Sequence, residues 1–434
     1  MNGRKRLPNN AGSVYQRKDG RWASAGYVHT TTGERKRVQF YGRTEEEARN
    51  KLLEALGNDR RGIPVPSASQ GVCEYLIYWR DHIAADKVRP STLATYDTYI
   101  RRYMLPYLDR KKLARLKAAD LRTWLRTLKV TCQCCAQETD AKRPAKKQRC
   151  CAKGRCCERY LSDASVYHVL RIFRAALQDA VGEDLLVRNV ARNVRVPAGR
   201  RKSRAITEEE ARKLLRAAAS DPLYALYAVA LAVGLRRGEA LGVRWEDLEL
   251  TCGRCGGSLV DPVHGAVCEG ADGTEPDSGV VHVRQTVQRV NGALIFQPPK
   301  TQNSERSVPL PAPCVSVLVA HWRRQREWAR RAGAEWQDSG LVFTTRAGGP
   351  IDPRNLVRSF VALCDRAGIR RVRFHDLRHS CATLLFAQGV EIGTVKEILG
   401  HSSTTITANI YVEVIKKLQQ DAVDSMNTLF EDEG

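Results

Sequence analysis

The chain has 434 residues, enough for two or three domains with cores of their own. Its 71 Lys and Arg residues outnumber 48 Asp and Glu, and the resulting formal charge of +23 favours a nucleic-acid partner over a merely soluble basic protein. No apolar run is long enough to span a bilayer, and the basic start MNGRKRLPNN lacks the apolar core of a secretory signal, so we expect an intracellular protein. Fourteen cysteines in that setting indicate metal ligands, redox groups or buried thiols rather than a disulfide framework.

Residues 1–62 predict a small module of three strands and one helix. The segment SVYQRKDGRWASAGYV forms two strand-like runs around Asp19-Gly20, and a turn at Thr32-Gly33 leads into a third strand over 37–41. A capping box of Thr44 and Glu47 then opens a helix. The apolar side of this helix is predicted to comprise Ala48, Leu52, Leu53 and Leu56. The basic residues near the sheet suit DNA, and the alternative is a solvated surface with no specific target.

Residues 67–195, which follow a linker containing two prolines, predict a bundle of helices. Apolar residues recur at helical spacing in segments 70–85, 91–106 and 118–129. A further helix pair is expected from about residue 165 to residue 190. Propensity alone therefore supports a domain of four or five helices.

A cysteine-rich insertion interrupts this bundle at residues 132–157. Its seven cysteines are Cys132, Cys134, Cys135, Cys150, Cys151, Cys156 and Cys157. Thiolates at this density suit zinc, which takes four tetrahedral ligands, although adjacent pairs differ from the usual Cys-x-x-Cys spacing. Two interpretations stay open: a structural zinc site that stiffens a DNA-facing loop, and a flexible basic loop with incidental thiols.

The last predicted domain covers residues 205–434 and begins with a capping box of Thr207 and Glu210. The run LYALYAVALAVGL is apolar on all sides, which is typical of a helix inside a core. This helix delivers Arg236 on a rigid support, as stabilisation of a charged transition state requires. Glu239, at i+3, is expected to orient Arg236 or to cap the local structure.

A second insertion with cysteines occupies residues 251–279. Cys252 and Cys255 form a Cys-x-x-Cys pair, and His264 and Cys268 follow at a spacing that would complete a zinc ribbon or knuckle. Such a zinc would be structural, because protein ligands would fill all four positions. The alternative is a plain loop.

A small antiparallel sheet is expected on both sides of this insertion, from Val243 to Leu250 and from Val280 to Phe296. The segment PPKTQNSERSVPL follows this sheet and contains Lys300, for which a phosphate contact at the surface is the ordinary expectation in a basic protein. Helices around 312–333 and 353–368 complete the domain.

The stretch HDLRHSCATLLFAQGVEIGTVKEILGHSSTTITANIY gathers the side chains that suit phosphodiester chemistry. Arg378 offers a planar fork of donors to phosphate oxygens, His375 and His401 can exchange protons near neutral pH, and the hydroxyl of Tyr411 can act as a nucleophile. The predicted buried side of the segment comprises Leu384, Leu385, Val390, Ile392, Val395 and Leu399.

This ordered set resembles the tyrosine recombinase (phage integrase) family. The resemblance rests on Gly-Leu-Arg ending at Arg236, the lysine hairpin, His-x-Leu-Arg-His, Leu-Gly-His, and a tyrosine ten residues later. It implies a multidomain α+β fold with an arm-type DNA-binding module, a helical core-binding domain, and a mostly helical catalytic domain with a small antiparallel sheet. The implied roles are nucleophile for Tyr411, phosphate stabilisation for Arg236, Arg378 and His401, and proton transfer for His375 and Lys300.

The implied activity is site-specific recombination through a 3′-phosphotyrosyl intermediate, which integrates or excises a mobile element and needs no cofactor for catalysis. The implied partners are double-stranded DNA attachment sites, further copies in a homotetramer, an excisionase and a DNA-bending host factor, in the cytoplasm of a bacterium at the nucleoid. Alternatives are a nicking-closing topoisomerase, which the front module disfavours, and a non-catalytic DNA-binding regulator or inactive relic. Residues 412–429 predict an amphipathic helix. The resemblance implies that this helix docks on a neighbouring subunit, and the alternative is that it packs on its own domain.

Overall fold

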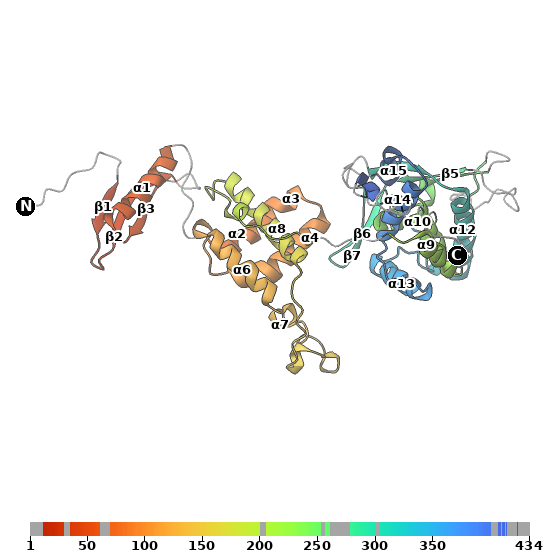
Figure 1. Cartoon of the computed structure of the whole chain (residues 1–434), viewed down its shortest axis with the longest axis horizontal. Helices are drawn as coiled ribbons and strands as arrows, with labels where there is room; N and C mark the ends of the chain where they lie inside the picture. The colour runs from red at the N-terminus through yellow and green to blue at the C-terminus, as the bar shows by residue number, and fades with distance from the viewer. Residues whose placement is uncertain are drawn as a thin grey trace, which may run out of the picture. The chain divides into compact units, whose positions relative to one another are not determined.

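The structure, a computed structural model of the chain, describes residues 12–29, 35–60, 70–199, 205–252, 257–260, 278–299, 304–400, 407–408, 410–412, 414 and 423. Contacts divide the chain into two units, Met1–Arg201 and Lys202–Gly434 (Figure 1). The predicted turn at Thr32-Gly33 and most of the predicted helix over 412–429 lie outside the described residues. Over the described ranges, no helix has the length and apolar character needed to cross a membrane.

The front module is a three-stranded antiparallel sheet with one helix packed on it, as the sequence predicts. Its elements are β1 (Ser13–Gln16), β2 (Trp22–His29), β3 (Arg35–Gly42) and α1 (Glu45–Arg60). The helix approaches the sheet closely because Ser24 donates a 2.6 Å hydrogen bond to the Ala48 carbonyl and Gly26 leaves room for Leu52. The prediction for Leu53 is wrong: its side chain is exposed, because one residue past Leu52 the helix has turned about 100° away from the sheet.

A bundle of helices forms the rest of the first unit (Figure 1). Its elements are α2 (Val72–Tyr78), α3 (Ala85–Lys87), α4 (Pro90–Tyr99), α5 (Leu105–Leu108), α6 (Ala118–Val130), α7 (Gln133–Ala136) and α8 (Asp163–Gly182). Two of its aromatic residues bury their rings and pair their polar ends: the Trp79 indole donates to Asp179 at 2.7 Å, and the Tyr75 hydroxyl donates to the Ala176 carbonyl at 2.8 Å. The predicted helix pair is instead one long helix, α8, followed by a single turn at Val190–Asn193.

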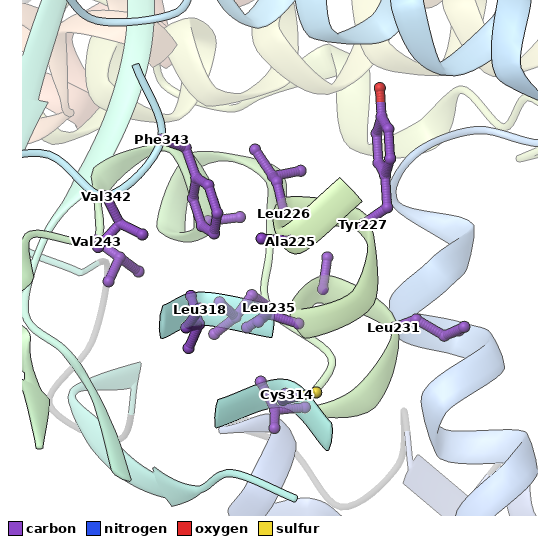
Figure 2. Packing of buried hydrophobic residues seen from close by; sticks show 14 of the residues in the cluster. Ala225, Leu226, Tyr227, Leu231, Leu235, Val243, Cys314, Leu318, Val342 and Phe343 are labelled. Atoms are coloured by element: carbon purple, nitrogen blue, oxygen red, sulfur yellow. The ribbon is translucent and has the colours of Figure 1, made fainter. Parts of the chain in front are cut away.

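The second unit is built around α10 (Tyr224–Ala232), the apolar helix that the sequence predicts to be buried. Its other helices are α9 (Glu208–Ala218), α11 (Arg237–Gly242), α12 (Ala312–Ala332), α13 (Pro353–Arg366), α14 (Asp376–Ala387) and α15 (Ile392–Leu399). Figure 2 shows residues of α10 packed among side chains of other segments, including Leu235, Val243, Cys314, Leu318, Val342 and Phe343. This core fixes the segment that leaves α10 and carries Arg236.

The strands of the second unit form two sheets, where the sequence predicts one. β4 (Leu248–Thr251), β5 (Ser278–Val283) and β8 (Arg306–Pro309) pair antiparallel in the order β4–β5–β8. β6 (Thr286–Val290) and β7 (Ala293–Gln297) form a separate hairpin that turns at Asn291 and Gly292, both with positive φ. The hairpin separates from β5 because β6 packs against α11, where Gly238 has no side chain to hold the strand away.

Candidate active site

Arg236 stands at the N-terminus of α11, four residues beyond the end of the buried helix α10. The chain turns between the two helices at Gly234, whose φ is +64° and whose missing side chain makes room for Leu399. The Arg236 guanidinium donates to Glu239 Oε1 at 2.5 Å and to the Gly400 carbonyl at 2.8 Å. About a third of its side chain stays exposed, so a rigidly held cation faces solvent.

Arg378 lies in the first turn of α14 and is only 2% exposed. Its guanidinium donates to the Gly234 carbonyl at 2.8 Å and to the Leu399 carbonyl. Burial, followed by the nearby positive charge of Arg236, lowers the pKa of Arg378 to about 9. The side chain therefore remains a cation at neutral pH, held by two carbonyls beside a second arginine.

Three arginines donate hydrogen bonds to the C-terminal end of α15. The consecutive carbonyls of Ile398, Leu399 and Gly400 accept from Arg306, Arg378 and Arg236, respectively. Gly400 ends the helix in the left-handed conformation, with a φ of +60°. Carbonyls at a helix C-terminus lack intrahelical partners and carry partial negative charge, so this end is a natural receptor for guanidinium groups.

Glu239 joins two of these arginines and is itself 3% exposed. Its Oε1 accepts from Arg236, and its Oε2 accepts from Arg306 at 3.1 Å. Burial opposes ionisation, but the positive charges of Arg306 and Arg236 outweigh it and hold the pKa of Glu239 below its ordinary value. Glu239 is thus a buried carboxylate that fixes the guanidinium of Arg236, in keeping with its predicted orienting role.

Sequence reasoning missed Arg306, the first residue of β8. Its side chain is 7% exposed and donates to Glu239, to the Ile398 carbonyl at 2.7 Å, and to the Ser304 carbonyl at 3.2 Å. The signal that could have found it is strand alternation, because Arg306 shares a strand face with the buried Val308. An arginine facing inward on a strand needs acidic and carbonyl partners, and here it has both.

His375 immediately precedes α14, three residues before Arg378. Its ring lies 5.3 Å from the ring of His379 in a perpendicular arrangement. Loss of hydration around the imidazole, then the positive charges of His379 and Arg378, lower the pKa of His375 to about 4. At neutral pH its imidazole is therefore uncharged and can both donate and accept a hydrogen bond.

Tyr411 presents a partly exposed side chain, 37% accessible, from the segment that follows α15. Its ring packs edge-on against Phe386 of α14, with the ring centres 5.2 Å apart. Ile410 and Val414 pack in the same small cluster as Val395 and Leu399. The tyrosine is therefore anchored to α14 and α15, the two helices whose residues position the arginines.

The predicted buried side of this stretch is correct at Val395 and Leu399 and wrong at Ile392, which is exposed in the first turn of α15. Lys300 and His401 lie outside the described residues, although Gly400, the neighbour of His401, closes the helix that holds the arginines. The structure therefore brings together Arg236, Arg378 and Glu239 and adds Arg306 to them.

Known proteins match the chain along most of its length. The phage integrase family matches residues 279–417, and the phage integrase N-terminal SAM-like domain matches residues 73–129. The chain is 28% identical over 414 residues to the XerC-like tyrosine recombinase of Caldanaerobacter subterraneus, which covers 91% of this chain and 92% of that protein. It is also 28% identical to an integrase of Streptomyces ambofaciens, over 98% of both chains. The chain belongs to the tyrosine recombinase (phage integrase) family.

The fold of the recombinase agrees with this assignment. A solved structure of the Tn1549 transposon integrase, in complex with a circular intermediate DNA, covers 82% of this chain and 100% of its own, with a TM-score of 0.55 at 17% identity. The family assignment makes the protein a site-specific recombinase, an enzyme that breaks and rejoins DNA strands.

The recombinase also gathers all seven cysteines of its first insertion. Two groups of four sulfur atoms each lie within 4.8 Å of one another. The first group comprises Cys132, Cys135, Cys151 and Cys156, and the second comprises Cys134, Cys150, Cys151 and Cys157. In the second insertion, Cys252 is buried, and the other predicted ligands, Cys255, His264 and Cys268, lie outside the described residues.

Proposed function

We propose that Tyr411 is the nucleophile with which the recombinase cleaves DNA. Its hydroxyl belongs to a side chain that is anchored through its ring on Phe386 yet partly open to solvent. A nucleophile needs both properties, because its attack requires a fixed direction and access to a large substrate. Attack on a scissile phosphate would form a 3′-phosphotyrosyl link and release a 5′-hydroxyl.

Arg236 and Arg378 are proposed to bind that phosphate and to stabilise the negative charge that develops during attack. A guanidinium has five N–H donors, and the contacts to Glu239 and Gly400 use two of those on Arg236. Because these contacts fix the guanidinium in advance, the transition state gains the charge interaction without reorganising the site. Arg306 does not need to reach DNA for this purpose; it holds Glu239 and the end of α15, and so acts as a positioning residue.

Proton transfer is proposed for His375 and Lys300, and donation to a phosphate oxygen for His401. A neutral imidazole at His375 can accept a proton from the tyrosine hydroxyl, in accord with its lowered pKa. Lys300 is proposed as the general acid toward the leaving 5′ oxygen. The phosphotyrosyl bond retains the energy of the broken phosphodiester, so the proposed reaction needs neither ATP nor a catalytic metal.

The front module is proposed to be an arm-type DNA-binding domain at residues 1–62, ahead of a core-binding domain at 67–195 and the catalytic domain at 205–434. The sheet face opposite α1 carries Tyr15, Tyr27, Gln39 and Tyr41. Arginines flank these rings: Arg17 lies 5.2 Å from the ring centre of Tyr41, and Arg35 lies 5.8 Å from that of Tyr27. An exposed sheet face of this kind suits insertion into a major groove.

The proposed assembly is a homotetramer on two double-stranded attachment sites, at the nucleoid of a bacterial cell, which integrates or excises a mobile element. Direction control would come from an excisionase and a DNA-bending host factor. Both insertions are proposed to bind structural zinc, the second through Cys252, Cys255, His264 and Cys268. None of these ions would take part in strand cleavage.

The nucleophile is tested by trapping the recombinase on a nicked suicide duplex that carries the element's own junction, followed by a denaturing gel. A covalent adduct is expected with the wild type and with the control Tyr78→Phe, which alters another exposed tyrosine. No adduct is expected with Tyr411→Phe, which keeps the ring contact with Phe386. An adduct that survives Tyr411→Phe would assign the nucleophile to another residue. If the wild type binds the junction but forms no adduct, the result would favour a non-catalytic DNA-binding regulator or an inactive relic.

A further inference from the structure

The first cysteine insertion has an ordered fold with almost no apolar interior. Between residues 131 and 160, the buried residues are Cys132, Gln133, Cys134 and Asp140. A segment of this size cannot be stabilised by hydrophobic burial when so little apolar surface is covered, and such segments depend on disulfides or metal ions. Its closely grouped sulfur atoms are therefore the side chains available to stabilise it through bound metal.

The separations between the sulfur atoms match a metal–thiolate cluster. They are 3.8 Å for Cys134–Cys150, 3.8 Å for Cys135–Cys156, 3.7 Å for Cys151–Cys157 and 3.9 Å for Cys132–Cys157. Zinc binds thiolate sulfurs at about 2.3 Å in a tetrahedron, which places neighbouring sulfurs about 3.8 Å apart. A disulfide would instead bring two sulfurs to about 2.05 Å.

Cys151 belongs to both groups of four sulfurs. Two tetrahedral ions would ordinarily need eight thiolates, and the insertion has seven. Sharing one sulfur lets seven cysteines complete two sites and leaves no cysteine of the insertion unused. The contact between Cys132 of the first group and Cys157 of the second shows that the two sites lie side by side, as a shared ligand requires.

The backbone around Cys151 is fixed by a buried aspartate. The side chain of Asp140 is fully buried, and its carboxylate accepts from the amides of Arg149, Cys150 and Ala152 at 2.9 to 3.3 Å. The chain then turns at Gly154, with a φ of +72°. These contacts fix the backbone that carries Cys150 and Cys151, so they hold both sulfurs in place as ligands.

We propose that the insertion binds two zinc ions that share Cys151 as a bridging thiolate. One ion is bound by Cys132, Cys135, Cys151 and Cys156, and the other by Cys134, Cys150, Cys151 and Cys157. Seven thiolates and two divalent ions leave three negative charges. Residues 131–160 contain eight lysines and arginines against three acidic residues, so the surrounding chain offsets this charge. The inference refines the proposed zinc binding by fixing the number of ions and the ligand they share.

Metal content can be counted against a variant that lacks the insertion. The Gln133 amide donates to the Arg159 carbonyl at 2.9 Å, so the two ends meet and residues 134–158 can be replaced by a short Gly-Ser turn. Both chains retain the second insertion, so its metal cancels in the comparison. The full chain is expected to carry two more zinc ions per molecule than the variant, by elemental analysis. A difference of zero would overturn zinc binding by this insertion altogether, and a difference of one would overturn the shared cluster alone. Iron or copper in place of zinc would also overturn the proposal.

The bridging sulfur is tested by loading the full chain with ¹¹³Cd and recording ¹¹³Cd NMR spectra. Two resonances that split each other are expected, because scalar coupling between the two ions passes through a common sulfur. Cys151→Ser is expected to abolish this splitting, whereas Cys135→Ser, which alters a ligand of one site only, is expected to remove one resonance. Two resonances without mutual splitting in the wild type would overturn the shared ligand, as would splitting that persists in Cys151→Ser.

Discussion

Arg306 and Glu239 form an ion pair of 3.1 Å in which both side chains are more than nine-tenths buried. The same carboxylate holds Arg236, whose guanidinium is proposed to contact the scissile phosphate. The orientation of Arg236 thus depends on a second arginine, Arg306, which holds the same carboxylate. We therefore propose that Arg306 supports catalysis through Glu239, without contacting DNA itself.

Replacing Arg306 with alanine is expected to destabilise the recombinase by about 3–5 kcal/mol, because it leaves the Glu239 carboxylate buried with one partner fewer. Chemical unfolding measures this loss. The control is Arg371→Ala, which breaks an exposed pair with Asp365 and should cost about 1 kcal/mol or less. An equal effect of the two substitutions would contradict the buried-pair interpretation.

The milder Arg306→Lys variant separates positioning from folding. Lysine keeps the charge but not the planar fork that reaches Glu239 and the Ile398 carbonyl together. Single-turnover cleavage is expected to slow by about 10²-fold, the scale of a small misplacement of catalytic groups, while affinity for the junction stays the same. A parallel loss of binding would show instead that Arg306 contacts DNA or supports the whole domain.

His375 is expected to impose no pH dependence on cleavage between about pH 5.5 and 8. Its pKa is lowered to about 4, so its imidazole is already neutral throughout this range. His375→Gln should reduce the single-turnover rate by about 10²-fold or more, and the pH profile should keep its shape. An inflection near pH 6.5 that disappears in the variant would show that His375 acts from its protonated form.

His321 is expected to make the second unit, Lys202–Gly434, less stable in mild acid. Burial lowers the pKa of this core histidine from 6.5 to about 4, and its Nε2 lies 2.9 Å from the Val342 carbonyl. Between pH 6.5 and about 4 the unfolded chain binds a proton that the folded chain resists, so stability is full above pH 6.5 and falls as the pH is lowered. The loss approaches about 3 kcal/mol.

This loss can be measured as the free energy of unfolding against pH. His321→Gln should remove much of the slope between pH 6.5 and 4, because glutamine can still donate to the carbonyl but does not titrate in this range. His168→Gln, at an exposed position of α8, serves as the control and should leave the slope intact. A wild-type slope that His321→Gln leaves unchanged would assign the acid sensitivity to other groups.

The front module is expected to bind DNA through the sheet face opposite α1. Arg37 pairs with Tyr27 across β2 and β3 on that face. Arg37→Ala should therefore weaken binding to DNA that carries the sites for this module, beside the junction, by about 1–3 kcal/mol. Cleavage of a short junction without those sites should not change. Arg49→Ala, on the exposed side of α1, is the control, and an equal loss of affinity there would indicate binding by charge alone.

The parts of the fold that the sequence predicts correctly depend on neighbours along the chain. Thr207 and Glu210 cap α9 as expected, and Gly20 forms the expected hairpin turn, because each motif contains all of its partners within four residues. The apolar helix α10 is likewise predicted from its own composition. The family motifs also predicted the convergence of Arg236 and Arg378.

The parts that could not be predicted depend on contacts between distant segments. In the sequence, Arg306 cannot be distinguished from other charged residues. Its role depends on the contact of β8 with α15, where Arg306 donates to the carbonyl of Ile398, 92 residues away. The cysteine spacing showed thiol density but not which sulfurs group together, because that depends on how the loop folds around Asp140. The separation of the β6–β7 hairpin from β5 likewise depends on α11, which precedes it by more than 40 residues.

The three arginines are held by main-chain carbonyls at the end of α15, and these acceptors do not change when a side chain is replaced. Alanine scanning of Ile398 and Leu399 would report only their packing and leave the hydrogen bonds in place. The acceptors for the guanidinium groups therefore do not depend on the identity of these two side chains. Only a change to the backbone would weaken these acceptors. An example is an ester in place of the amide that follows Leu399, because an ester carbonyl is a weaker hydrogen-bond acceptor than an amide carbonyl.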